Sequence, residues 1–333
     1  MSSHSAGKHA IAETKQSPHV AIILVNYKGA SDTLACVASL EQLAYPDFSI
    51  WVVENGSEDS SEALLREQLP GHVHLIVSPD NKGFSGGNNL AIQEILKQES
   101  LNPDQPKTAY IWLLNNDTTV EPHALSYLVE DGQKSGGIVG SLLLYPDHQY
   151  QQVGTVFQWL TGSSRGVSQE QLKEGMTVDS VSGASMLIPE SALRRVGLMD
   201  ESYFLYFEDG DYCLRARQKN YPVTVCLRSR IYHKEGASTG RKSLATQYYF
   251  HRNRTRLFLK LANPLQQVSI ILYLGFRLLR SSVKALLSKD PQKQLSNHII
   301  WLAARDALSG IEGRCPYNLS HDNYPAPQHG APA

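Results

Sequence analysis

Short apolar runs alternate with longer amphipathic segments along the first third of the chain. Four runs have the length and composition of buried strands: VAIILVNY, FSIWVVENGS, HVHLIVS and YIWLLNND. The segments between them, at 31–43, 60–69 and 87–97, space their apolar residues as helices do. Strands alternating with helices in this way predict βαβ units and a parallel sheet.

Beyond residue 120 the predicted order is less regular. Glu121-Pro122 favours a helix start, and GIVGSLLLY, QVGTVFQWL and VSGASMLIP each predict a strand. The segment 208–220, EDGDYCLRARQKN, predicts a helix because its first acids and later cations match the helix dipole. PVTVCLRSRIYH predicts a pair of strands, and from Tyr248 onward the pattern is helical.

Composition narrows the class of protein. A chain of 333 residues fits one main domain with an appendage. A formal net charge of -1 gives no global basic field, which argues against a nucleic-acid partner. The four cysteines show neither a C-x-x-C pair nor zinc-like spacing, so we expect free thiols in a reducing compartment, the cytoplasm.

The two ends of the chain differ from the rest. Residues 1–18 are mostly polar and small, without the apolar core of a signal peptide or a membrane span, and we expect a disordered tail. Residues 311–333 are rich in Pro, Gly and polar side chains and predict a second disordered tail.

Two nucleotide-binding motifs are absent. The turn after the first strand, NYKGASD, lacks the G-x-G-x-x-G of dinucleotide-binding proteins, and the chain contains no P-loop. The glycine-rich NKGFSGGNN predicts a loop of close approach with Asn81, Asn88 and Asn89 as polar contacts, or a glycine turn into a helix.

Asp117 ends an apolar strand, where open α/β sheets bind their ligands. Four strand ends, NYK, ENGSED, NKGFSGGNN and LNND, together resemble the inverting GT-A glycosyltransferases of family 2, particularly the bacterial rhamnosyltransferase-like branch. SGASMLIP, GLMDESYFLYFEDGDYCLRARQKNY, YHKEGAS and YYFHRN extend the resemblance over about 20–258.

The resemblance implies an α/β GT-A fold, with a Rossmann-like, mostly parallel nucleotide-binding sheet and a C-terminal helical appendage. The catalytic domain is then expected at 19–258, with a nucleotide-binding half at 19–120 and an acceptor half at 121–258, followed by helices at 259–310. It also implies a nucleotide-diphosphate sugar donor, Mg²⁺ or Mn²⁺, and a glycan or lipid-linked acceptor in polysaccharide biosynthesis for the cell envelope.

Glu54 matches the family acid that meets the pyrimidine base, where a carboxylate can accept the N3–H of uracil or thymine. Because the family residue is usually Asp, participation of Asn55 and Asp59 stays open. Transferred position by position, the resemblance implies donor-binding residues at Asn26, Tyr27, Glu54, Asn55, Ser57, Asn81, Gly83, Gly86, Asn88, Asn116 and Arg252.

Asp117 and His233 match the family's metal-binding residues, and both supply ligand atoms that Mn²⁺ accepts. The alternatives are that Asp117 caps a turn and that His233 is structural. Asn116 stands where relatives carry a second acid or Pro. Arg252 is expected to neutralise the leaving diphosphate, or to belong with Arg256 to a solvated basic face.

The Glu208-Asp209 pair matches the acids that include the general base of the inverting enzymes. We expect Asp209 to be the base and Glu208 to support it, the alternative being acids that merely favour a helix start. Asp211 precedes Arg215 by four residues and predicts an ion pair.

These features predict a metal-dependent inverting hexosyltransferase that moves a sugar, with rhamnose as best candidate, from a dTDP or UDP carrier to a hydroxyl. The alternatives are a nucleotidyltransferase and a non-catalytic sugar-nucleotide-binding partner. The helix expected at 264–289 carries Arg277, Arg280 and Lys284 on one face. It predicts either peripheral contact with the inner membrane face or packing onto the catalytic domain. The sequence leaves the oligomeric state open.

Overall fold

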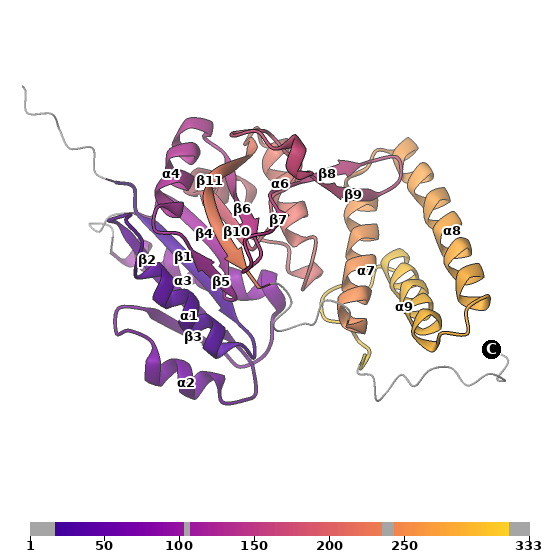
Figure 1. Cartoon of the computed structure of the whole chain (residues 1–333), viewed down its shortest axis with the longest axis horizontal. Coiled ribbons are helices and arrows are strands. Elements are labelled where there is room, and N and C mark those ends of the chain that lie inside the picture. The colour runs from indigo at the N-terminus through magenta and orange to yellow at the C-terminus, as the bar shows by residue number, and fades with distance from the viewer. Residues whose placement is uncertain (1–16, 103–106, 235–242, 320–333) are drawn as a thin grey trace, which may run out of the picture.

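The computed structural model describes residues 17–102, 107–234 and 243–319. Its central feature is a nine-stranded sheet with the order β3-β2-β1-β4-β10-β6-β11-β5 and β7 paired to β6 (Figure 1). Strands β3, β2, β1 and β4 are parallel, whereas β10 runs antiparallel to both its neighbours, β4 and β6. The strands are β1 Val20–Asn26, β2 Phe48–Asn55, β3 His74–Ser78, β4 Tyr110–Asn115, β5 Thr118–Val120, β6 Ile138–Leu144, β7 Tyr150–Gln152, β10 Ser185–Pro189 and β11 Val223–His233.

Helices cover both faces of this sheet. Alternate residues of β1 enter two different cores, Ile22 with helices α1, α2 and α4, and Ile23 with α3, α5 and α6. The helices are α1 Ala30–Leu40, α2 Ser61–Gln68, α3 Gly83–Leu101, α4 Ala124–Ser135, α5 Glu190–Val196 and α6 Glu208–Gln218, with short 3₁₀ turns η1 Gln169–Gln171 and η2 Glu201–Tyr203. The predicted α/β class and the mostly parallel sheet are confirmed.

Two local predictions differ from the structure. PVTVCLRSRIYH forms the single strand β11, whose pairing with β6 is irregular between Cys226 and Arg230, so it is not a strand pair. QVGTVFQWL divides between β7 and β8 (Thr155–Gln158), and β8 pairs with β9 (Ser163–Gly166) outside the main sheet.

The glycine-rich stretch takes the second of its two predicted forms, a glycine turn into a helix, because it makes the first turns of α3. Gly83 begins this helix with φ +71°, and a Cβ there would lie 2.2 Å from the carbonyl oxygen of Phe204. Glycine is therefore needed for both its backbone conformation and its close approach.

Three helices follow the sheet and stand beside it (Figure 1): α7 Leu244–Leu261, α8 Pro264–Leu286 and α9 Pro291–Leu308. Helix α7 joins the two parts, since Phe258 packs with Phe157 of β8 while Tyr248 packs with Ile299 of α9. None of the described helices combines the length and hydropathy that crossing a bilayer requires.

The segment after α9 packs against these helices as far as the structure describes it. The Cys315 backbone N–H donates to the Tyr249 hydroxyl at 2.7 Å, and Tyr317 packs beside Tyr248. Residues 311–319 of the expected C-terminal tail are thus ordered by contacts, while 1–16 and 320–333 lie outside the described residues. All four cysteines are free thiols, as predicted.

Candidate active site

A cavity of about 1340 Å³ opens at the carboxyl ends of the parallel strands. One side is lined by the ends of β1, β2 and β4 and the start of α3, and the other by the start of α6 and one face of α7. Strand ends meet here because parallel strands point their carboxyl ends at the same edge. Of the predicted site residues, the cavity wall includes Tyr27, Asn55, Asn81, Gly83, Asn116, Asp117, Glu208, Asp209 and His233.

Asp117 and His233 come together from β4 and β11. The Asp117 Oδ1 atom lies 3.2 Å from Nε2 of His233, and both side chains are about nine-tenths buried. The backbone reinforces this pairing, because β11 pairs with β5 directly after Asp117 and the Lys234 N–H donates to the Asp117 carbonyl oxygen. One carboxylate oxygen and one imidazole nitrogen therefore face the same point in the cavity.

The neighbours of His233 favour one tautomer. Nδ1 lies 2.9 Å from Oε1 of Gln151, an acceptor, and Nε2 lies 3.1 Å from Nδ2 of Asn115, a donor. The proton then belongs on Nδ1, and the Nε2 lone pair accepts from the Asn115 amide within 3.2 Å of the Asp117 carboxylate. A carboxylate oxygen and an imidazole nitrogen this close together, with half-buried partners, are a donor set that fits a divalent cation such as Mn²⁺.

Glu54 lies behind the cavity wall instead of in it. Its carboxylate accepts from Nδ2 of Asn26 and from the backbone N–H of Ser57 at 2.7 Å, so both oxygens are engaged within the protein. Ser57 in turn accepts from the Lys28 N–H at 2.9 Å. This buried network fixes the loops after β1 and β2, which places Tyr27 and Asn55 at the wall.

The start of α3 forms the floor next to these loops. The Asn55 amide donates to the Gly83 carbonyl oxygen at 3.0 Å, and Asn81 Oδ1 accepts from the Gly83 N–H at 2.8 Å. Asn88 is buried one turn later and donates to the Phe84 carbonyl oxygen, while Gly86 packs against the Lys82 side chain. Asn88 and Gly86 thus lie behind the cavity wall and support the start of α3.

Asn116 connects the loop that carries Asp117 to α1. Its amide donates to Thr33 Oγ1 at 2.9 Å, and Thr33 donates to Oδ1 of Asn26 at the same distance. Asn116 therefore anchors the segment that carries Asp117 to the end of β1.

Glu208 and Asp209 begin α6 on the opposite wall. Asp209 is fixed by two backbone donors, the N–H of Gly183 at 3.1 Å and that of Gly210 at 2.7 Å. Glu208 is buried, and its Oε2 has no hydrogen-bond partner among the described residues. Burial and the adjacent Asp209 raise the pKa of Glu208 well above its usual value, and burial also raises the pKa of Asp209.

The five residues before these acids, Tyr203 to Phe207, form a strained segment that we call the acid loop. Phe204, Tyr206 and Phe207 have φ values of 64°, 67° and 71°, a region that bulky residues seldom adopt. Asn253 of α7 holds them there, with Nδ2 at 2.8, 2.7 and 3.0 Å from the carbonyl oxygens of Tyr203, Leu205 and Tyr206.

Arg252, next to Asn253 on α7, also contacts the acid loop. It is fully buried and donates to the Tyr203 carbonyl oxygen and to Oδ1 of Asn253. The structure brings it neither to the cavity wall nor to a solvated basic face. Arg256, one turn later, donates to the Ser202 carbonyl oxygen at 2.9 Å. Both cations serve the acid loop and the turn before it.

Asp211 pairs with Arg215 at 2.6 Å, as the four-residue spacing predicts, and also with Lys260 at 2.8 Å. Its carboxylate is fully buried, and Asp211 does not line the cavity, unlike Glu208 and Asp209. Its role is therefore to secure α6 against α7.

Four residues that contribute to the site were missed from the sequence. Gln151 orients His233, Gly183 donates to Asp209, Asn253 holds the acid loop, and His251 lines the cavity. Gly183 and Asn253 lie inside the motifs SGASMLIP and YYFHRN, so the motifs pointed to these two positions. Nothing in the motifs indicated which residues they contact. Gln151 lies in a segment without any motif.

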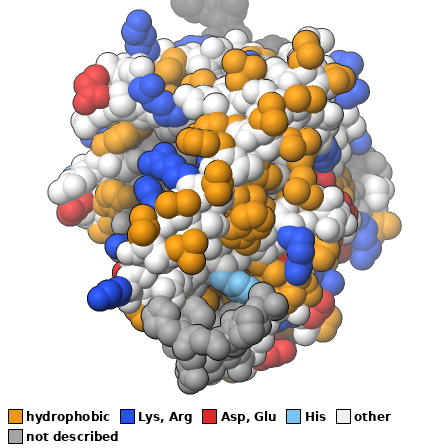
Figure 2. All heavy atoms as spheres, turned by 90° about the vertical axis from the view of Figure 1, so that its right-hand side faces the viewer, with side chains coloured by type: hydrophobic (Ala, Val, Ile, Leu, Met, Phe, Trp, Pro, Cys, Tyr) orange, Lys and Arg blue, Asp and Glu red, His pale blue; other side chains and the backbone are white. Residues whose placement is uncertain are grey.

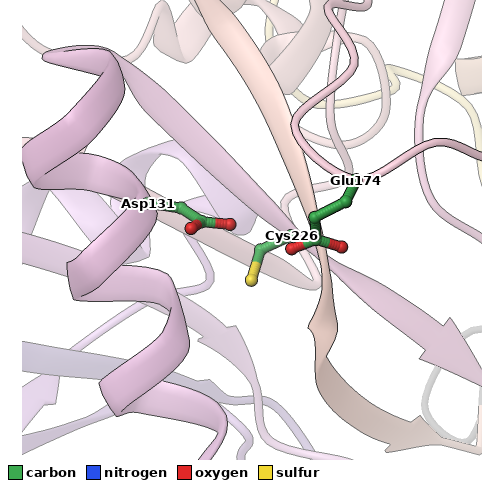
Figure 3. A group of neighbouring side chains, drawn as sticks. All are labelled: Asp131, Glu174 and Cys226. Carbon is green, nitrogen blue, oxygen red and sulfur yellow. The ribbon is translucent and has the colours of Figure 1, made fainter.

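A second group of potential metal ligands, Asp131, Glu174 and Cys226, lies apart from the cavity between α4 and β11 (Figure 3). Arg228 already bonds Asp131 at 2.7 Å and Glu174 at 3.3 Å. Burial raises the pKa of the Cys226 thiol, which disfavours the thiolate that binds metals. Arg228 therefore supplies the positive charge that these acids require.

Comparison with known proteins places these observations in a family. The model described as "Glycosyltransferase like family 2" matches residues 18–254. The low-salt glycan biosynthesis hexosyltransferase Agl10 of Haloferax volcanii is 29% identical, covering 78% of this chain and 84% of its own. An N-acetylglucosaminyl-diphospho-decaprenol L-rhamnosyltransferase of Mycobacterium tuberculosis is 23% identical, covering 72% and 83%.

Solved structures are similar in fold. GalNAc-T7 with UDP, GalNAc and Mn²⁺ superposes with a TM-score of 0.58 at 12% identity, over 94% of this chain and 59% of that one. The mannosyltransferase PcManGT from Pyrobaculum calidifontis, in complex with GDP-Man and Mn²⁺, gives 0.54 at 14% identity over 88% of both chains. Both support the GT-A fold with helices after the sheet.

Proposed function

Because this chain belongs to glycosyltransferase family 2 and is a sugar transferase, we propose that it transfers a hexose from UDP or dTDP to an acceptor hydroxyl with inversion at the anomeric carbon. The cavity supports this proposal, since it joins a wall of strand-end amides to a wall that carries two carboxylates. A donor held on the first wall would present its sugar to the second. An acceptor hydroxyl would then approach from the α6 and α7 side.

Asp117 and His233 would hold Mn²⁺ or Mg²⁺, because their ligand atoms converge at 3.2 Å inside the cavity. When bound, the ion would neutralise the diphosphate of the donor. Gln151 holds the proton of His233 on Nδ1, and the ion would take the Nε2 lone pair in place of the Asn115 amide. The strand-end side chains Tyr27, Asn55 and Asn81 would contact the nucleotide, with Glu54 and Asn26 holding those loops from behind.

Asp209 would accept the proton of the acceptor hydroxyl as that oxygen bonds to the anomeric carbon and the diphosphate leaves from the opposite side. Two backbone N–H groups fix its orientation. Burial and the neighbouring Asp209 both raise the pKa of Glu208. A protonated Glu208 donates a hydrogen bond, which would orient the acceptor while Asp209 stays ionised.

Rhamnose from dTDP is the donor we propose first. Its support is the rhamnosyltransferase relative from Mycobacterium tuberculosis, whose name gives N-acetylglucosaminyl-diphospho-decaprenol as its acceptor. By the same comparison, the acceptor would be a glycan or a lipid-linked sugar, made in the cytoplasm for a cell-envelope polysaccharide. The family match sets aside the nucleotidyltransferase alternative.

The observation that carries the proposal is the convergence of Asp117 and His233 opposite Asp209 in one cavity. The test is the melting temperature of the protein with a panel of UDP- and dTDP-sugars, with and without Mn²⁺, because a bound ligand raises the melting temperature. We expect one sugar nucleotide to raise it most, and only with metal. Transfer of that sugar to a hydroxyl acceptor then completes the test. No metal-dependent shift with any member of the panel would contradict the proposal.

A further inference from the structure

Helix α8 exposes a long apolar stripe to solvent. Its outward residues lie between 58% and 84% exposed and follow one another at spacings of three, four and seven residues, which places them on one side of the helix. We call this stripe the α8 surface: Leu265, Val268, Leu272, Phe276, Leu279 and Leu286. At 23 residues the helix is roughly 34 Å long, so the stripe is extended.

The opposite side of α8 is already packed. Ile270, Leu274, Leu278 and Ala285 are buried, with Leu274 and Leu278 against Ala304 of α9 and Ile270 in the cluster of Phe258. The core contacts that hold α8 therefore do not use the α8 surface. The two alternatives predicted from the sequence, packing and an outward contact, belong to different sides of the same helix.

Positive charge borders the α8 surface. Arg277, Arg280 and Lys284 lie along one edge of the stripe, and α8 contains no Asp or Glu from Pro264 to Leu286. None of these cations forms an ion pair with the described part of the chain, although the whole protein has a formal charge of -1. The charge of this helix is thus opposite in sign to that of the chain.

Other segments extend the same face. Leu160, 67% exposed, is carried by the β8–β9 hairpin, whose Leu160 carbonyl oxygen accepts from Ser269 of α8 at 2.6 Å. Trp301 of α9 is half exposed and its indole N–H donates to Ser282 of α8. Figure 2 shows apolar side chains gathered across this face with Lys and Arg around them. Trp is a residue that membrane interfaces favour.

From these observations we propose that the α8 surface docks the enzyme onto an anionic lipid bilayer, with the helix lying in the interface. Apolar side chains would enter the acyl boundary, and the exposed cations Arg280 and Lys284 would reach lipid phosphates. A second copy of the chain is a poorer occupant, because two such faces would bring like charges together without any acid on α8 to offset them. The absence of a spanning helix among the described residues fits a peripheral mode.

The location of the cavity gives this docking a use. His251 of α7 lines the cavity, and burial followed by the charge of Arg277 lowers its pKa to about 4. Arg277 on the basic edge of α8 therefore lies near His251, while α8 itself contributes no residue to the cavity wall. Docking would hold the enzyme at the surface that carries a bilayer-anchored acceptor. Only this use of docking rests on the proposed function. Membrane docking can therefore be refuted while sugar transfer is confirmed.

Vesicle flotation with the full-length protein tests the proposal. We expect the protein to float with phosphatidylcholine–phosphatidylglycerol vesicles at low salt, to bind pure phosphatidylcholine weakly, and to be partly released by salt. The double variant Leu272→Glu with Phe276→Glu should lose roughly a hundredfold or more in partitioning, because two exposed apolar groups no longer enter the lipid. Arg280→Glu with Lys284→Glu should lose binding to the anionic vesicles alone.

Matched controls use exposed residues elsewhere. Leu101→Glu places the same charge on an exposed leucine at the end of α3, and Arg195→Glu with Lys219→Glu repeats the double charge reversal on exposed positions of the catalytic domain. Both controls should float like the parent protein. All these variants should keep their melting temperature and their transfer to a water-soluble acceptor.

Three outcomes would overturn the docking. One is a parent protein that does not float with anionic vesicles at low salt. A second is a dimer in light scattering that Leu272→Glu with Phe276→Glu converts to a monomer, which would assign the α8 surface to a second copy. Equal loss of flotation in the controls would also reject it, since net charge alone would then govern binding.

Discussion

Replacing Asn253 by Ala should slow sugar transfer more than it weakens nucleotide binding. The Asn253 amide has two N–H groups for three carbonyl oxygens at 2.7–3.0 Å, and its side chain is fully buried. Removing it takes this donor from the partly buried carbonyl oxygens of Leu205 and Tyr206, while that of Tyr203 keeps Arg252. At about 1–3 kcal/mol for each fully buried acceptor, roughly 2–6 kcal/mol is the upper limit of the loss. The acid loop also loses the contacts that keep three bulky residues at positive φ.

The two effects can be measured separately. Urea unfolding gives the loss in stability, and single-turnover transfer with saturating donor gives the loss in rate. Displacement of the Glu208-Asp209 pair by about 1 Å would lower the rate constant by about 10², while the Kd for the nucleotide should change little because the strand-end wall is intact.

Leu65→Ala is the matched control. Leu65 is fully buried on α2, far from the acid loop in the chain and outside the cavity wall, and its truncation should cost about 2–5 kcal/mol. Both variants are compared at a temperature where circular dichroism shows each to be folded. If Asn253→Ala is destabilised but transfers as fast as Leu65→Ala, the acid loop does not position the acids and the reasoning is wrong.

Four further outcomes follow from the site. Asp117→Ala should abolish the Mn²⁺-dependent gain in nucleotide affinity measured by titration without acceptor; an unchanged gain would move the metal site elsewhere. Asp209→Asn should lower single-turnover transfer by about 10² to 10⁴ with donor binding retained, Glu208→Gln should do less, and Asp211→Asn less still; a larger loss in Glu208→Gln would exchange the first two roles. Since its pKa in the folded protein is raised, Glu208 contributes stability that is complete below its usual pKa and is lost as pH rises through the raised value. Glu208→Gln should therefore raise the melting temperature at neutral pH more than at pH 4, and the reverse order would refute burial of that carboxyl. The buried His251, with a pKa lowered to about 4, contributes stability that is present above its usual pKa and lost as pH falls towards 4, so His251→Gln should flatten this acid limb in a thermal pH series.

The sheet could be predicted because its strands are nearly continuous apolar runs with helix-length spacers. The motif order was equally informative, since strand-end positions such as Asn55 and Asp117 share one edge in any parallel sheet. Contacts that depend on distant partners were not predictable. Nothing in the local sequence of Glu54 shows that Asn26 and Ser57 engage its carboxylate.

Arg252 illustrates a different limit. A cation beside another cation at four-residue spacing favours a basic face, and the sequence does not reveal that the acid loop folds back over it. The loop adopts positive φ at residues that normally avoid it, so no local propensity predicts its path. Burial of Arg252 depends on that path, because the Tyr203 carbonyl oxygen is one of its acceptors.

A single backbone hydrogen bond ties the two walls of the cavity together. The Phe84 N–H, at the start of α3, donates to the Phe204 carbonyl oxygen in the acid loop at 2.7 Å, directly above Gly83. Under the proposed donor contact at Asn81, a redesign of residues 81–84 for a different sugar nucleotide also moves the segment that leads to the acids. On that proposal, donor preference and turnover are not independent engineering targets, and libraries at α3 should be screened for both at once.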